Sequence, residues 1–155
     1  MKKTKIHLDQ GDPLEQLMPR IKGKVFHVSK ARNWPNIEFI GRILPNENGE
    51  LETSFGSSSN SYFKNKRCVS VFDYRNIHEA EPKKHIHKCR PTKPLTPEEG
   101  IVIFVLGQES YDKLEPWDGW SHGDTRQMVV PYIEAGYPGA IELSQIEELI
   151  FVTVS

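Results

Sequence analysis

The sequence lacks the features of a membrane-spanning or exported protein. No apolar run approaches the roughly 20 residues that cross a bilayer as a helix. The first ten residues, MKKTKIHLDQ, are basic, but they contain none of the apolar stretch that a signal peptide requires. We therefore expect a soluble protein with no membrane partner and a cytoplasmic location.

Cysteine is scarce as well. Cys68 and Cys89 are the only cysteines in 155 residues, which is too few for a disulfide framework and suits a reducing compartment. A chain of this length can bury a core without such cross-links, and its 37% hydrophobic content is enough to form one. We expect a single domain over residues 1–155.

The familiar nucleotide-binding and protease signatures are also missing. The chain contains no G-x-G-x-x-G, no P-loop and no H-E-x-x-H. A nucleotide that binds this protein is therefore held by neither a Rossmann motif nor a Walker motif. We find no internal repeat.

Apolar patterns predict several short strands. Some segments alternate between apolar and polar residues, and IVIFVL is a continuous apolar run typical of a strand buried on both faces. The expected strands cover residues 24–29, 68–74, 101–106, 128–134 and 150–154. Residues 135–139, AGYPG, read as a turn between the last two.

Helical patterns are few and short. Residues 1–22 read as an N-terminal helical extension, in which Asp12 can cap a helix and Pro13 can begin it. A second short helix begins after Asn33 and ends at Gly41, and a third is expected within 143–149. Because the crossovers are too short for a doubly wound sheet, these elements predict an α+β fold with a mainly antiparallel sheet.

Charge is distributed unevenly along the chain. Residues 1–97 carry 18 Lys/Arg against 10 Asp/Glu, a net of +8, whereas residues 98–155 carry 2 against 11, a net of −9. Either the two halves pack together and cancel, or a basic half receives phosphates beside an acidic half that carries a catalytic carboxylate.

Three residues stand out when they are taken together in chain order. His27 lies within a predicted strand, where an imidazole needs a hydrogen-bond partner. Tyr62 follows a Ser-rich loop, and Glu134 follows an apolar stretch, where a carboxylate is costly unless it is paired or used. Singly, each has an ordinary explanation: a structural histidine, a core aromatic and a water-facing glutamate.

The order of these residues resembles the H-Y-E class of ADP-ribosyltransferase folds, and especially the DNA-targeting toxins of that class. A first-strand His precedes a short helix and a Gly in KVFHVSKARNWPNIEFIGRIL, a Tyr follows in mid-chain, and Glu134 is followed by a hydrophobic turn and a β-rich end. The resemblance covers residues 24–154. It implies a split antiparallel sheet and an enzyme that consumes NAD.

The resemblance also assigns roles. Glu134 is expected to stabilise the oxocarbenium-like transition state formed when the nicotinamide–ribose bond breaks. His27 is expected to bind the other ribose, and Tyr62 to stack on the nicotinamide ring. Ser29 and Arg67 are further NAD-binding candidates, for ribose and pyrophosphate respectively.

The sequence differs from the toxins at two places, and one of these differences limits which group is expected to accept ADP-ribose. One more residue separates Phe63 from Arg67 than in the corresponding Tyr-Phe…Arg element of the toxins. Tyr132 stands where arginine-modifying members carry Glu or Gln, which argues against arginine as the acceptor. The acceptor is left open as a nucleic acid, a protein or water, and family analogy suggests a toxin or defence factor.

Other interpretations stay open at this stage. Residues 81–97 read as a basic, Pro-rich loop, and its segment 82–94 could contact phosphates in a non-enzymatic nucleic-acid- or protein-binding module. An inactive member of the same fold is a third alternative. His85, His87 and Cys89 would share one face of a strand and could ligate zinc, but paired zinc-binding spacings are missing, so we expect no metal.

Overall fold

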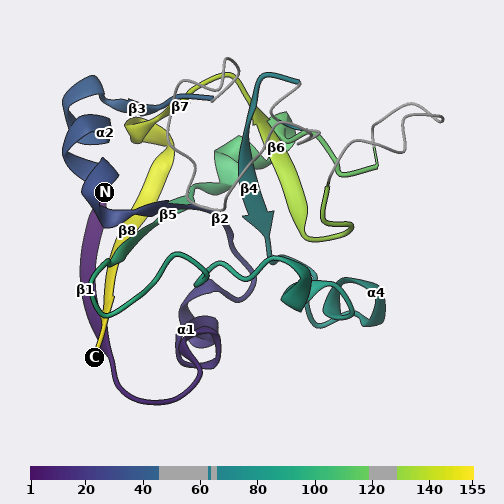
Figure 1. Cartoon of the computed structure of the whole chain (residues 1–155). Coiled ribbons are helices and arrows are strands. Elements are labelled where there is room, and N and C mark those ends of the chain that lie inside the picture. Colours follow the sequence, from purple (N-terminus) through teal and green to yellow (C-terminus); the bar gives the residue numbers. More distant parts are fainter. Residues whose placement is uncertain (46–62, 64–65, 119–128) are drawn as a thin grey trace.

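The computed structural model of the chain describes residues 1–45, 63, 66–118 and 129–155. It confirms the α+β class, with a mostly antiparallel sheet and few short helices (Figure 1). The strands are β1 (Lys2–Leu8), β2 (Val25–Lys30), β3 (Arg42–Ile43), β4 (Cys68–Asp73), β5 (Ile101–Leu106), β6 (Glu134–Pro138), β7 (Ile141–Glu142) and β8 (Ile146–Val154). The helices are α1 (Pro13–Ile21), α2 (Trp34–Ile40) and α4 (Ala80–Lys83), with 3₁₀ turns η1 (Ala31–Asn33), η2 (Ile86–Lys88), η3 (Gln108–Lys113) and η4 (Leu143–Gln145).

Six strands form the main sheet in the order β1-β8-β5-β2-β4-β6. Strands β1 and β8 are parallel, and the other neighbours in this sheet are antiparallel. Strands β3 and β7 pair separately as a short ribbon. The order places β2, β4 and β6 side by side at one end of the sheet, so the strands that carry His27 and Glu134 are separated only by β4.

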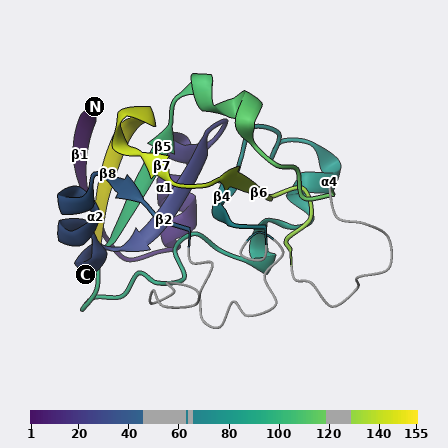
Figure 2. The ribbon, with the colours of Figure 1, turned by 90° about the horizontal axis from the view of Figure 1, so that it is seen from above.

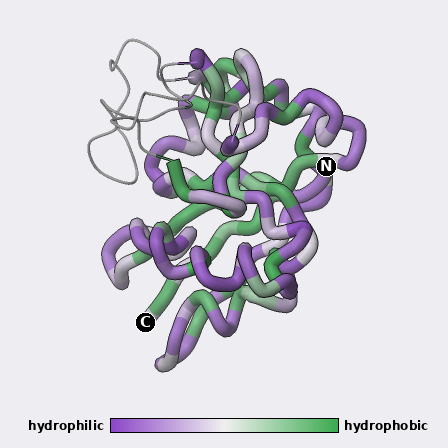
Figure 3. The backbone as a smooth tube through the Cα atoms, turned by 90° about the vertical axis from the view of Figure 1, so that its right-hand side faces the viewer, coloured by the Kyte–Doolittle hydropathy of each residue, from purple (hydrophilic) through white to green (hydrophobic). Residues whose placement is uncertain are grey.

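The sheet has an apolar layer on each face. Helix α1 packs on one face, where Leu14, Leu17 and Ile21 join Phe26 and Val28 in a buried cluster. Helix α2 and the β3–β7 ribbon cover the other face, as Figures 1 and 2 show from two directions. Every residue of β5 is buried, and the apolar strands run through the middle of the molecule in Figure 3. This confirms the prediction from the run IVIFVL.

Strands β2 and β4 pair only briefly. Their register joins Val25 to Asp73 and Phe26 to Phe72, whereas β4 and β6 pair over five positions. At the next residue of β2, the imidazole of His27 bonds to the backbone of β4. Backbone pairing between β2 and β4 therefore ends at Phe26, and at His27 a side-chain bond to the Ser70 carbonyl takes its place.

Several predicted boundaries are wrong. Residues 2–8 form strand β1 and not part of a helical extension, although α1 does begin at Pro13 with Asp12 as its cap. In the described part of the segment 128–134, residues 131–133 form a turn, and AGYP belongs to β6. Most of the expected helix at 143–149 lies in β8.

The segment 81–97 is more ordered than a plain loop. It contains the end of α4, the turn η2 and further turns, and it packs through Ile86 and Leu95 on the α1 side of the sheet. Among the described residues, no helix has both the length and the apolar character needed to cross a membrane.

Candidate functional site

Glu134 is held by two neutral hydrogen-bond donors. It is the first residue of β6, and its Oε2 accepts the hydroxyl of Ser70 on β4. Its Oε1 accepts the backbone N–H of Val130 at 3.0 Å. A carboxylate offers about four acceptor positions, so the group can still accept bonds from a ligand.

The surroundings of Glu134 shift its ionisation. Burial raises the pKa of this carboxyl above its ordinary value, while the bonds from Ser70 and Val130 lower the pKa and offset part of that effect. The raised pKa shows that the two donors compensate only partly for lost solvent. A positive charge developing nearby would interact strongly with a carboxylate in such a site.

His27 is oriented by the same residue, Ser70. Its Nδ1 lies 2.8 Å from the carbonyl oxygen of Ser70, so Nδ1 donates and the neutral ring keeps Nε2 as an acceptor. Burial lowers the pKa of His27, and the bond to Ser70 opposes that shift. The ring, half-buried and near Phe104 at a centroid distance of 6.0 Å, is suited to accept a hydroxyl and not to carry a charge.

His27 and Glu134 leave opposite faces of the sheet. Side chains alternate along a strand. His27 therefore lies on the same side of β2 as Val25, which packs in the apolar layer on the face covered by α2. Glu134 is the strand partner of Phe72, so the two side chains lie on the same face of the sheet. Phe72 packs against the apolar layer on the face covered by α1. Ser70 links the two residues, through its carbonyl to one and through its hydroxyl to the other.

The remaining predicted residues lie at different places. Ser29 is on the His27 side of β2, buried, and accepts a bond from Asn33 Nδ2 at 2.9 Å. Arg67 is exposed just before β4, at the opposite end of the β4–β6 pair from Glu134. The structure therefore does not bring Arg67 to the carboxylate.

Tyr62 lies outside the described residues, but its neighbour Phe63 is described. The Phe63 ring is fully buried against Gly136, where an added Cβ would lie 2.2 Å from the ring. Gly136 is the strand partner of Ser70. Phe63 is thus packed on β6, two residues along that strand from Glu134.

The HIHKC segment does not form the strand on which a zinc site would depend. Residues 86–88 form the turn η2, so His85, His87 and Cys89 do not alternate along a strand. Within the described ranges, no three His, Cys, Asp or Glu side chains are placed to hold a metal ion. Burial first, and then the charge of Glu134, raise the pKa of the Cys89 thiol, which disfavours the thiolate that binds metals.

Ser70 is the residue that sequence reasoning missed. The alternation of CVSVFDY places Ser70 on the face opposite Val69 and Val71, but this pattern alone gives the hydroxyl no partner. Its partner becomes evident only once residues 68–72 are paired with 134–138. Comparisons of the chain with protein-family models, with curated proteins and with solved structures gave no match.

Proposed function

We propose that this protein is an NAD-consuming enzyme of the ADP-ribosyltransferase type, acting as a transferase or as an NAD glycohydrolase, with Glu134 as its catalytic carboxylate. The observation that carries the proposal is the set of bonds around Ser70, which places the strands of His27 and Glu134 on either side of β4 and ties both residues to it.

The chemistry follows from the state of each group. Breaking the nicotinamide–ribose bond builds positive charge on the ribose, which a preorganised, partly desolvated carboxylate stabilises. In the part of the chain that the structure describes, the Ser70 and Val130 donors to the two Glu134 oxygens are neutral, so these bonds leave its negative charge uncompensated. The hydroxyl of Ser70 and the N–H of Val130 hold it in one orientation.

His27 has a smaller part in this proposal than Glu134. With Nδ1 bonded to Ser70, its Nε2 is the ring atom that can accept a ribose hydroxyl, but the ring and the carboxylate project from opposite faces. The proposal therefore depends on Glu134 first.

The test measures nicotinamide released from NAD by the purified protein, with water alone and with DNA, RNA or protein added as acceptor. We expect release by the native protein and a loss of about 10²-fold or more in Glu134→Gln, with an unchanged melting temperature. Glu115→Gln is the matched control, because Glu115 is a half-buried glutamate whose backbone bonds to Gly136 of the same strand. Full release by Glu134→Gln, or no release by the native protein with any acceptor, contradicts the proposal.

A second function, nucleic-acid binding without turnover, is favoured by one observation. The ring of His85, in the basic segment 82–94, stacks on Tyr132, and Lys83, Lys84 and Lys88, its neighbours in sequence, are exposed. Aromatic rings among lysines are typical of surfaces that bind single strands. Salt-sensitive binding of an oligonucleotide that persists in Glu134→Gln, with no nicotinamide release by the native protein, would favour this function.

A further inference from the structure

The backbone of Tyr132 has a conformation that tyrosine rarely adopts. Its φ is 64°, in the left-handed region. A non-glycine residue there is strained, and the conformation persists only where the surroundings enforce it. Tyr132 is 39% exposed, so burial of its side chain does not account for the conformation.

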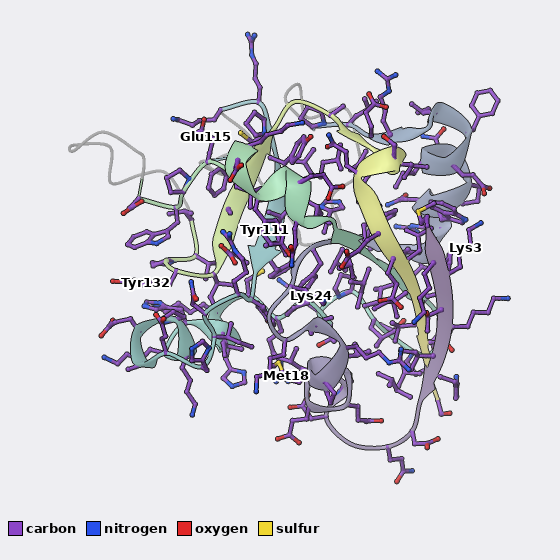
Figure 4. All side chains as sticks on the ribbon, turned by 180° about the vertical axis from the view of Figure 1, so that it is seen from behind. Lys3, Met18, Lys24, Tyr111, Glu115 and Tyr132 are labelled. Carbon is purple, nitrogen blue, oxygen red and sulfur yellow. The ribbon has the colours of Figure 1, made fainter. Side chains whose placement is uncertain are left out.

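Two rings from distant parts of the chain contact Tyr132. The ring of His85, which precedes η2, is stacked on it with centroids 5.5 Å apart and planes 29° apart. The indole of Trp117, which follows η3, lies 4.7 Å away and is tilted by 43°. Figure 4 shows Tyr132 beside α4, on the outer side of the molecule. The ring thus joins its own turn to two separate segments.

The turn that contains Tyr132 also supplies a hydrogen bond to Glu134. The N–H groups of Ile133 and Glu134 both donate to the carbonyl of Val130, at 3.4 and 3.0 Å. The N–H of Val130 in turn donates to Glu134 Oε1. Because these bonds close around Tyr132, a change in its backbone moves the Val130 donor relative to the carboxylate.

We propose that Tyr132 is a positioning residue for Glu134: its ring, held by His85 and Trp117, keeps the turn at residues 130–133 in the conformation that aims the Val130 N–H at the carboxylate. This inference rests on the proposed role of Glu134 as the catalytic carboxylate. Tyr132 acts through the turn and need not touch the substrate.

Three variants separate the ring from the backbone. Tyr132→Phe keeps the ring. Tyr132→Gly removes the ring, but glycine accepts a positive φ without strain, so the backbone conformation stays accessible. Phe39→Leu is the control for loss of an exposed aromatic ring, since Phe39 on α2 is 89% exposed and lies on the other side of the sheet.

Two measurements are made on each variant: steady-state nicotinamide release, and hydrogen exchange of the Val130 amide. We expect Tyr132→Gly to lower kcat by about 10- to 100-fold, with the KM for NAD changed less than about twofold. We also expect its Val130 amide to exchange about tenfold faster or more. Tyr132→Phe and Phe39→Leu should match the native protein in both.

The outcomes distinguish this inference from the proposed function. A Tyr132→Gly protein with native kcat, a change confined to KM, or a Val130 amide that exchanges at the native rate would each overturn the positioning role. If the native protein releases no nicotinamide, the proposed function has failed. The exchange of the Val130 amide in Tyr132→Gly then decides by itself whether the ring holds the turn.

Discussion

At the scale of single residues, the hydroxyl of Ser70 opposes the effect of burial on the pKa of Glu134. Its bond lowers the pKa of Glu134 against the larger, opposing effect of burial. Removing the hydroxyl in Ser70→Ala therefore raises that pKa further. Glu134 must be ionised to stabilise positive charge, so activity falls as the pH drops through its pKa. We expect the acidic limb of the pH–rate profile for nicotinamide release to move to higher pH in Ser70→Ala.

The control for this prediction keeps the hydroxyl. Ser70→Thr retains a donor at the same position and suits an exposed strand site, so its acidic limb should stay near that of the native protein. A limb that stays in place in Ser70→Ala, or that moves equally in both variants, would show that Ser70 does not govern the ionisation of Glu134.

Residue-level chemistry was only partly predictable from the sequence. Glu134 is recognisable because a carboxylate beside an apolar stretch requires hydrogen-bond partners, and in the structure Ser70 and Val130 are those partners. Ser70 itself lies 64 positions away along the chain, and no local pattern connects the two. The placement of Arg67 away from the carboxylate depends on strand register, which the sequence pattern does not contain.

At the scale of elements, Asp12 both begins α1 and joins it to the basic segment. Its Oδ1 accepts the N–H of Leu14 at 3.0 Å as an N-cap, and its carboxylate pairs with Arg90. Asp12→Ala loses both contacts, whereas Asn at this position still caps a helix. In urea unfolding we expect Asp12→Ala to lose about 0.5–2 kcal/mol, and Asp12→Asn to lose less than about 1 kcal/mol, since the lost ion pair is partly exposed.

A neighbouring acid provides the comparison for Asp12. Asp9 is exposed and precedes the helix without capping it, so Asp9→Ala should leave the free energy of unfolding nearly unchanged. The Arg90 side chain is the largest cause of the lowered pKa of Asp12. The contribution of the Asp12–Arg90 interaction to the free energy of unfolding is therefore present at neutral pH, and it is lost as the pH falls through the lowered pKa of Asp12. Equal losses in Asp12→Ala and Asp12→Asn would contradict the capping role.

Elements whose patterns are local were predicted well, and those that depend on distant partners were not. Strands β2, β4 and β5 follow their apolar patterns, and α2 ends at Gly41 with a φ of 83°. Strand β1, with its lysines, is a strand because it pairs in parallel with β8, at the far end of the chain. The turn before β6 lies in an apolar sequence that predicts a strand, and its Tyr132 contacts rings that are distant along the chain.

At the scale of the whole molecule, the basic and acidic halves of the chain pack against each other. Strand β1, from the basic half, pairs along its length with β8, from the acidic half. Ion pairs in the described part of the chain join the halves at Lys2–Glu148, Lys24–Glu147, Arg32–Glu99 and Arg42–Glu142. This packing supports the simpler of the two interpretations of the charge asymmetry, in which the halves cancel.

Attraction between the halves predicts how salt affects stability. The net charge is −1, so there is little overall repulsion for salt to screen, whereas opposite charges face each other across the fold. Screening lengths fall from about 10 Å at 0.1 M salt to about 3 Å at 1 M. We therefore expect sodium chloride, raised from about 0.05 to 0.5 M, to lower the free energy of urea unfolding by about 1 kcal/mol.

One pair of substitutions tests whether attraction across the fold is the cause. Glu147→Lys places a like charge beside Lys24, with which Glu147 now pairs at 3.4 Å, so salt should destabilise this variant less than it destabilises the native protein. Adding Lys24→Glu exchanges the two charges and should restore the native salt dependence. Both side chains are about 44% exposed, so neither change disturbs the core. A native protein that salt leaves unchanged or stabilises, or an exchange that restores nothing, would mean that strand pairing and the apolar layers hold the two halves together without a net contribution from charge.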